Sequence, residues 1–191
     1  ELVQVSEPSD KTREIISEMK KDMYRLNKVA QRFSQIGSER DLTPFNLSEI
    51  LNELIEYFRR RLPQTGKTVV IEEDYDKSIE CSINRDLFEW AVENLVKNSL
   101  DAIENGEGKI QVDLRKQDNT DWIVIEVADN GKGMNKQQQK SIYKPGFSTK
   151  KRGWGLGLNF TKRIIEDYHR GRLILRSSRP GEGTTMRILL K

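Results

Sequence analysis

The chain has 191 residues, of which 35% are hydrophobic and 33% are charged, and its formal net charge is +3. This length and composition fit one globular domain of ordinary size with a short extension. Because basic and acidic residues are interleaved along most of the chain, the small positive surplus does not indicate nucleic-acid binding.

The single cysteine, Cys81, excludes an internal disulfide and favours a reducing compartment. Its position between Ile79 and Ile83 predicts a small buried side chain rather than a reactive thiol. No apolar run approaches the ~20 residues of a membrane span, and no signal peptide is visible. The first residue is not Met, so we expect a fragment or processed form of a longer protein. The lack of a span and of a signal peptide, with the single cysteine, leads us to expect a cytoplasmic piece without membrane contact. A longer protein that contains it could still be membrane-anchored.

Residues 9–36 are predicted to form a long helix, with Ser9 and Asp10 as caps and Gly37 at its end. Apolar residues three and four apart form a heptad seam along this helix: Ile16, Met19, Met23, Leu26, Ala30 and Phe33. Three further apolar residues, Ile15, Val29 and Ile36, widen the apolar stripe, which is typical of a helical bundle. A single helix cannot bury such a stripe, so we expect a homodimer through residues 9–36.

The remaining chain predicts alternating helices and pairs of strands. We expect a linker over 38–45, then a helix over 47–61 that is capped by Asn46 and ends before Pro63. The elements expected after it are strands over 68–75 and 79–83, a helix over 86–103, strands over 109–115 and 122–128, a helix over 158–168, and strands over 173–177 and 184–190.

Residues 129–157 are rich in Gly and Lys and lack periodicity, and a connection this long is better interpreted as a functional loop or lid. Pairs of strands between helices predict an α+β fold, a two-layer sandwich with a mixed, mainly antiparallel sheet. We therefore divide the chain into a helical segment over 1–40 and a domain over 41–191.

Two asparagines on the helix over 86–103 are the first candidate site residues. Asn94 and Asn98 lie four residues apart, so their side chains share one helix face, and Asp101 shares that face with Asn98. Carboxamide oxygens are hard ligands that suit Mg²⁺. On their own, the two asparagines would be better interpreted as a polar helix surface.

Two glycine-containing segments are the next candidates. Asp129–Met134 (DNGKGM) follows a strand, and its carboxylate can accept a hydrogen bond from the exocyclic amine of adenine, although an ordinary turn would look the same. Gly153–Leu158 (GWGLGL) precedes a helix, where backbone N–H groups can bind phosphate. This second segment is neither a Walker A loop nor a Rossmann fingerprint.

In combination and order, these motifs resemble those of sensor histidine kinases. Residues 94–102 resemble the N box, Asp129–Met134 the G1 box and Gly153–Leu158 the G2 box. Phe147, within residues 145–150, resembles the F box, and Gly183 with its two threonines resembles the last glycine–threonine element. The resemblance covers about residues 10–191. It implies the Bergerat-type sandwich shared with gyrase, heat-shock chaperone and mismatch-repair ATPases.

The resemblance also implies the ligands, ATP and Mg²⁺, and the role of each matching residue. Asn98, helped by Asn94, would hold Mg²⁺, while Asp129 would bind the adenine amine. Asp101 would line the same cavity, and Lys150 would meet the triphosphate. The other residues assigned to the nucleotide are Gly131, Gly133, Phe147, Arg152, Gly153, Gly155, Leu156, Gly157, Leu158, Thr184 and Thr185.

Asn94 favours phosphotransfer over hydrolysis. Hydrolytic members of the superfamily carry a glutamate there as the base that activates water, and an amide cannot take a proton at neutral pH. Glu93 is about 100° around the helix and should point elsewhere. We therefore expect an ATP:protein-histidine phosphotransferase whose partners are its own dimerisation hairpin and a response regulator.

The acceptor histidine of that reaction is not evident in the chain. His169, the only histidine, lies at the end of a predicted helix, where an ordinary surface or dipole-facing role is favoured. Residues 9–36 resemble the second helix of the hairpin, so the acceptor would belong to another segment. Asp101 departs from the basic residue that some sensor kinases have there. The alternatives are a serine kinase or ATPase of the same fold, and a nucleotide-binding module without transfer activity.

Overall fold

The computed structural model describes residues 12–13, 15–20, 23, 41–62, 68–104, 107–150 and 154–191. The chain divides into two compact units, Glu1–Glu39 and Arg40–Lys191. The described residues of the first unit are helical, and four of their apolar side chains are exposed: Ile15, Ile16, Met19 and Met23. Most of the predicted helix over 9–36 lies outside the described residues, so its extent and the dimer remain predictions. Within the described part of the chain, no helix has the length and apolar character needed to cross a membrane.

The second unit is built on a five-stranded sheet with the strand order β2-β4-β5-β7-β6. Its strands are β2 (Val69–Tyr75), β4 (Gly108–Lys116), β5 (Ile123–Asp129), β6 (Arg172–Arg179) and β7 (Gly183–Leu190). The β2–β4 pair is parallel and the other three pairs are antiparallel. The mixed, mainly antiparallel sheet predicted from the sequence is confirmed.

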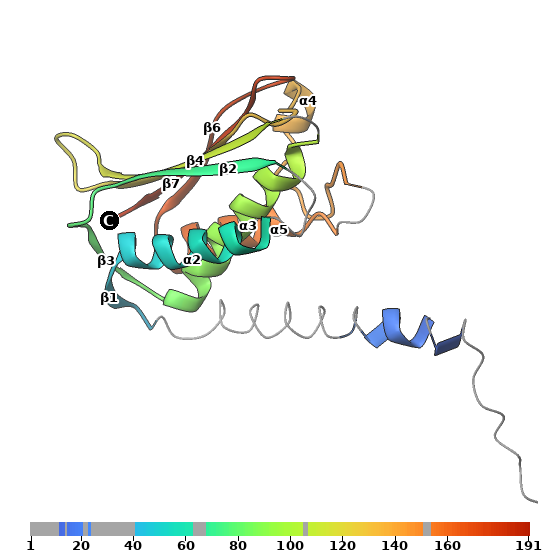
Figure 1. Cartoon of the computed structure of the whole chain (residues 1–191). Helices are drawn as coiled ribbons and strands as arrows, with labels where there is room; N and C mark the ends of the chain where they lie inside the picture. The colour runs from blue at the N-terminus through green and yellow to red at the C-terminus, as the bar shows by residue number, and fades with distance from the viewer. Residues whose placement is uncertain are drawn as a thin grey trace, which may run out of the picture. The chain divides into compact units, whose positions relative to one another are not determined.

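Helices cover one face of this sheet (Figure 1). They are α2 (Leu47–Arg61), α3 (Arg85–Ala102) and α5 (Gly157–Arg163), which continues into a π-helical turn, η2 (Ile164–Tyr168). The side chains on the facing surfaces form one apolar core, in which Phe88 of α3 and Ile125 of β5 are almost fully buried. This single covered face makes the domain a two-layer sandwich.

Asn46 sets the start of α2, as predicted. Its Oδ1 accepts hydrogen bonds from the N–H groups of Ser48 and Glu49 at 2.9 and 3.3 Å. These contacts satisfy two of the donors that every helix start leaves without a helical partner.

The strand pairing corrects two expectations. Residues Thr43–Asn46 form β1, so the predicted linker over 38–45 is wrong at its end. β1 pairs with β3 (Glu80–Ile83) in a separate two-stranded sheet, so β3 is not a partner of β2 despite the tight turn between them. The parallel pairing of β2 with β4 needs a crossover, which α3 supplies. Cys81 on β3 is buried as expected, and burial raises the pKa of its thiol to about 11.

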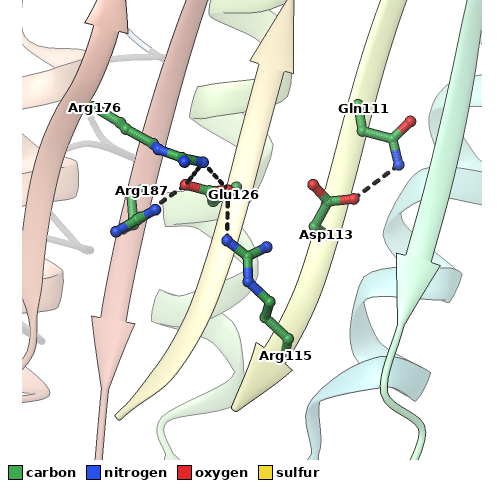
Figure 2. Close-up of polar contacts among 6 residues, drawn as sticks. All are labelled: Gln111, Asp113, Arg115, Glu126, Arg176 and Arg187. Carbon is green, nitrogen blue, oxygen red and sulfur yellow. Dashed lines mark hydrogen bonds and ion pairs between the residues drawn. The ribbon is translucent and has the colours of Figure 1, made fainter. Parts of the chain in front are cut away.

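The opposite face of the sheet, which no helix covers within the described part of the chain, holds an ion cluster around one buried carboxylate (Figure 2). Glu126 of β5 is 3% exposed, and its carboxylate accepts hydrogen bonds from three arginines on three different strands. The donors are Arg115 at 2.9 Å, Arg176 at 2.7 Å and Arg187 at 2.7 Å. The pairing of β6 with β7 shifts register between Leu175 and Ser177, which leaves Arg176 as the extra residue of a β-bulge. Such a bulge changes the direction of the side chain at that position. Glu126 thus cross-links β4, β6 and β7 through β5.

Candidate functional site

Asn94 lies where α3 approaches the start of α5. Its Nδ2 donates a hydrogen bond to Oγ1 of Thr161, a buried residue of α5, at 2.9 Å. A Cβ on Gly157, the first residue of α5, would lie 2.4 Å from Oδ1 of Asn94. Only glycine permits this approach, so the amide of Asn94 is held by the first turns of the helix that follows the glycine-rich loop.

Asn98, one turn further along α3, faces the lid. Its Oδ1 accepts a hydrogen bond from the ammonium of Lys150 at 2.8 Å. The same ammonium lies 2.6 Å from Oδ2 of Asp101. Asn98, Asp101 and Lys150, which the sequence assigned to one site, are therefore in direct contact.

Asp129 ends β5 on the face of the sheet that the helices cover. Its Oδ1 accepts a hydrogen bond from the N–H of Gly131 at 2.9 Å, and the Ser99 side chain and the Thr184 backbone also donate to its carboxylate. Burial raises the pKa of Asp129, and these neutral donors offset that effect only in part. A further donor to the carboxylate would therefore lower the cost of its burial.

The glycines after Asp129 are required by close backbone contacts. A Cβ on Gly131 would lie 2.7 Å from the backbone carbonyl of Ala102, at the end of α3. Gly133 has a φ of +62°, and a Cβ there would lie 1.8 Å from the carbonyl oxygen of Arg179. These contacts press the loop against α3 and β6, so they fix the position of Asp129.

The lid contains a short helix, α4 (Lys136–Gln139), which the sequence did not predict because it is only four residues long. Beyond it, the N–H of Gly146 donates to the carbonyl of Gly155 at 3.1 Å. Gly155 has a φ of +66°, and a Cβ there would lie 2.6 Å from the backbone of Phe147. The predicted F-box and G2-box segments are therefore paired.

Three further predicted site residues lie near this pairing. Leu156 directly precedes α5, and the side chains of Phe147 and Leu158 are half-buried. Trp154 is 49% exposed. Arg152 and Gly153 lie outside the described residues, so their roles remain predictions.

The two threonines of β7 lie on different faces of the sheet. Thr184 is the register partner of Asp129, and Thr185 is the partner of Ala128. Because side chains alternate along a strand, Thr184 points to the side of Asp129, and Thr185 points to the side of Glu126. The geometry therefore favours Thr184 as the base-pocket residue.

The sequence reasoning missed Ser99 and Thr161, which hold Asp129 and Asn94 in place. Both are polar residues that the structure buries, at 4% and 1% exposure. The signal was available for Ser99, which follows Leu95 by four residues on the apolar stripe of α3. A hydroxyl on such a stripe needs a partner in the fold.

His169 is a buried structural residue, so of the two expected roles the surface one is wrong, while its contact with the last helical turn agrees with a role at the helix end. Its Nδ1 donates to the carbonyl of Ile164 at 2.8 Å, and its Nε2 accepts from the N–H of Asn84 at 3.1 Å. Burial lowers the pKa of the imidazole, so it is neutral with the proton on Nδ1. Glu93, as expected, points away from Asn94 and pairs with Lys97 at 2.5 Å.

Comparison with known proteins identifies this arrangement. Residues 83–191 match the model of the Histidine kinase-, DNA gyrase B-, and HSP90-like ATPase family. The chain is 29% identical over its whole length to sporulation kinase B of Bacillus subtilis, of which it covers 42%. It is 30% identical to the sensor histidine kinase ZraS of Salmonella typhimurium, with 93% of the chain and 37% of the relative covered. The chain thus spans less than half the length of these curated relatives.

Solved structures agree on the fold. The catalytic domain of histidine kinase ThkA superposes with a TM-score of 0.69 at 24% identity, covering 78% of this chain and 95% of that domain. The Acinetobacter baumannii histidine kinase AdeS superposes with a TM-score of 0.72 at 18% identity, covering 98% and 87% of the two chains.

The fold and the matched motifs define an ATP-binding sandwich domain. The chain belongs to the Histidine kinase-, DNA gyrase B-, and HSP90-like ATPase family, and it is similar to the catalytic regions of sensor histidine kinases.

Proposed function

We propose that this chain binds Mg²⁺·ATP between α3, the end of β5 and the lid, and that it transfers the γ-phosphoryl group to a histidine. The acceptor histidine would lie on a dimerisation helix outside this chain, paired with residues 9–36 in a homodimer. The phosphorylated kinase would then serve a response regulator. The relative ThkA has been solved in complex with the response regulator TrrA, which supports this class of partner. The reaction would take place in the cytoplasm.

The observation that carries this proposal is that the side-chain amide of Asn94 is held in place by its contacts. Its amide donates to Thr161 and packs against Gly157, so the side chain is fixed beside the glycine-rich loop. An amide there cannot deprotonate a water molecule, and the adjacent carboxylate of Glu93 is engaged by Lys97. These contacts favour positioning of ATP for transfer over activation of water for hydrolysis.

The donor set fits Mg²⁺·ATP. Asn98 offers one carboxamide oxygen, and Mg²⁺ typically takes few protein ligands, with phosphate oxygens and water completing its coordination. When bound, the ion would neutralise charge on the transferring phosphoryl group. Asp129 would accept a hydrogen bond from the adenine amine, Gly131 and Gly133 would shape the base pocket, and the backbone around Gly155 would contact phosphate.

Nucleotide binding is tested with a fluorescent ATP analogue in the presence of Mg²⁺. Asp129→Asn should weaken binding roughly 10- to 100-fold, since a hydrogen bond to a buried charge contributes about 1.5–3 kcal/mol. Thr185→Ser, on the opposite face of the sheet, is the control and should bind normally. Unchanged affinity in Asp129→Asn would remove the adenine assignment.

Transfer is tested by adding a purified acceptor hairpin and γ-labelled ATP. We expect acid-labile phosphohistidine on the hairpin. Acid-stable phosphoserine would favour a serine kinase, release of free phosphate without protein labelling would favour an ATPase, and binding without turnover would favour a non-catalytic module.

A further inference from the structure

Lys150 of the lid is hydrogen-bonded to Asn98, the residue that the proposed function assigns to Mg²⁺ as a ligand. Its ammonium lies 2.8 Å from Oδ1 of Asn98 and 2.6 Å from Oδ2 of Asp101. The cation that Asn98 contacts in the structure is therefore one of the chain's own side chains.

Lys150 and Mg²⁺ cannot share this oxygen without cost. Mg²⁺ binds oxygen at about 2.0–2.1 Å, so an ammonium at its present distance from Asn98 would lie within about 5 Å of the ion. Two cations this close repel each other, and no carboxylate except Asp101 is in contact with the ammonium among the described ion pairs. Binding of one at Asn98 disfavours binding of the other.

Asp101 determines where the ammonium rests. Asn98 and Asp101 are three residues apart on α3, so their oxygens lie side by side and both reach one ammonium. A carboxylate at this place would repel the phosphates of ATP if it stood alone. Paired with Lys150, it carries no net charge and holds the lid residue over Asn98.

The backbone of the lid makes this contact specific to Lys150. The N–H of Lys150 donates to Oγ of Ser148 at 3.1 Å, and Gly146 is bonded to Gly155 at 3.1 Å. The segment that carries Lys150 is thus hydrogen-bonded to Gly155 of the glycine-rich loop.

We propose that Asp101 is a positioning residue that holds Lys150 on Asn98 until Mg²⁺·nucleotide displaces it. Loading of the site exchanges one cation for another at Asn98 and releases Lys150 beside the incoming phosphates. This inference rests on the proposed function for the identity of the displacing ligand, but the contact itself is a property of the free chain.

The test uses Asp101→Asn, Lys150→Gln and the double variant in the full chain. Glu104→Gln is the matched control, because Glu104 also pairs with a lysine, Lys132, at 2.6 Å near the end of α3. Hydrogen exchange of residues 144–150 is first measured without metal or nucleotide. Both single variants should exchange faster, by up to about fivefold for a partly exposed ion pair, and the double variant should add nothing. Exchange rates equal to those of the unsubstituted chain would overturn the proposal.

The Mg²⁺ concentration that gives half-maximal binding of the ATP analogue is measured next. Asp101→Asn should lower it by about two- to fivefold, the size expected for a partly exposed ion pair, and Glu104→Gln should leave it unchanged. If Asp101→Asn has the same effect in the Lys150→Gln background, the carboxylate acts directly on Mg²⁺·ATP and the proposal fails. If no variant binds the analogue, the proposed function fails, and the exchange measurement still decides whether Asp101 holds Lys150.

Discussion

Asp129 and Glu126 lie three residues apart on β5, on opposite faces of the sheet, and their charges are balanced in different ways. Glu126 is surrounded by three guanidinium groups (Figure 2). Burial alone would raise the pKa of Glu126, but the hydrogen bonds from Arg115 and Arg187, with the charges of Arg187 and Arg176, lower it. Asp129 receives hydrogen bonds only from neutral groups, and burial raises its pKa.

The difference separates a structural carboxylate from one that suits a ligand. The charge of Glu126 is fully compensated by the fold, so the fold depends on it and a ligand has nothing to add. The charge of Asp129 is only partly compensated, so a donor from a ligand would stabilise it. An undercompensated carboxylate at a strand end, followed by two glycines, is therefore a stronger indication of a site than a dense ion cluster.

Removal of the charge of Glu126 should have the largest effect on stability. Glu126→Gln leaves three guanidinium groups without their anion, which should reduce the free energy of unfolding by about 3 kcal/mol. The midpoint of urea unfolding measures this effect, and affinity for the ATP analogue should be unchanged in the folded protein.

Asp113→Asn is the matched control for this substitution. Asp113 is the register partner of Glu126 on β4 and accepts a hydrogen bond from Gln111 at 2.8 Å, without an arginine of its own among the described contacts. Its substitution should change stability by less than about 0.5 kcal/mol. Equal losses in the free energy of unfolding in the two variants would mean that the ion pairs around Glu126 do not stabilise the fold more than an ordinary polar contact does.

Asp129→Asn should have a much smaller effect on stability than Glu126→Gln, although it weakens nucleotide binding. A neutral amide escapes the cost of burying a charge but loses a hydrogen bond from a backbone N–H, and the two effects should cancel to within about 1 kcal/mol. Urea unfolding without nucleotide measures the change. A loss of stability as large as that of Glu126→Gln would make Asp129 a structural residue.

Local patterns predicted most elements because their causes are local. α2 spans 47–61 as expected, since a capping asparagine precedes it and a proline follows within two residues. The pairing partners were not predictable, because β1 contains Pro44 and is only four residues long. Such a strand has no periodicity to detect, and its partner β3 is chosen by the packing of the whole domain.

The candidate site also combines residues that local motifs predict with contacts that depend on the packing of the whole domain. Asn94, Asn98 and Asp129 stand out in short motifs, and the structure brings each of them against a glycine or the lid. The contact of Lys150 with Asp101 joins residues 49 positions apart, and the cluster of Glu126 joins four strands. The sequence assigned Lys150 and Asp101 to one site but did not predict that they pair, and it did not predict the cluster, because no spacing in the sequence records which distant segments become neighbours.

The smallest expected effect is on the acid sensitivity of the fold, where the two carboxylates should act in opposite directions. The lowered pKa of Glu126 means that its contribution to stability is present above its unfolded value of about 4.3 and is lost as the pH falls through the folded value. The raised pKa of Asp129 means that its ionised form costs stability at neutral pH. This cost disappears as the pH falls through its folded value.

Urea unfolding at pH 7, 5 and 4 should therefore show a shallower loss of stability in Glu126→Gln and a steeper loss in Asp129→Asn than in the unsubstituted chain. Each slope should change by a fraction of the about 1.4 kcal/mol per pH unit that one full proton contributes. Slopes that change in the same direction in both variants would show that the two carboxylates are balanced alike, and the separation of a structural from a ligand-ready carboxylate would be wrong.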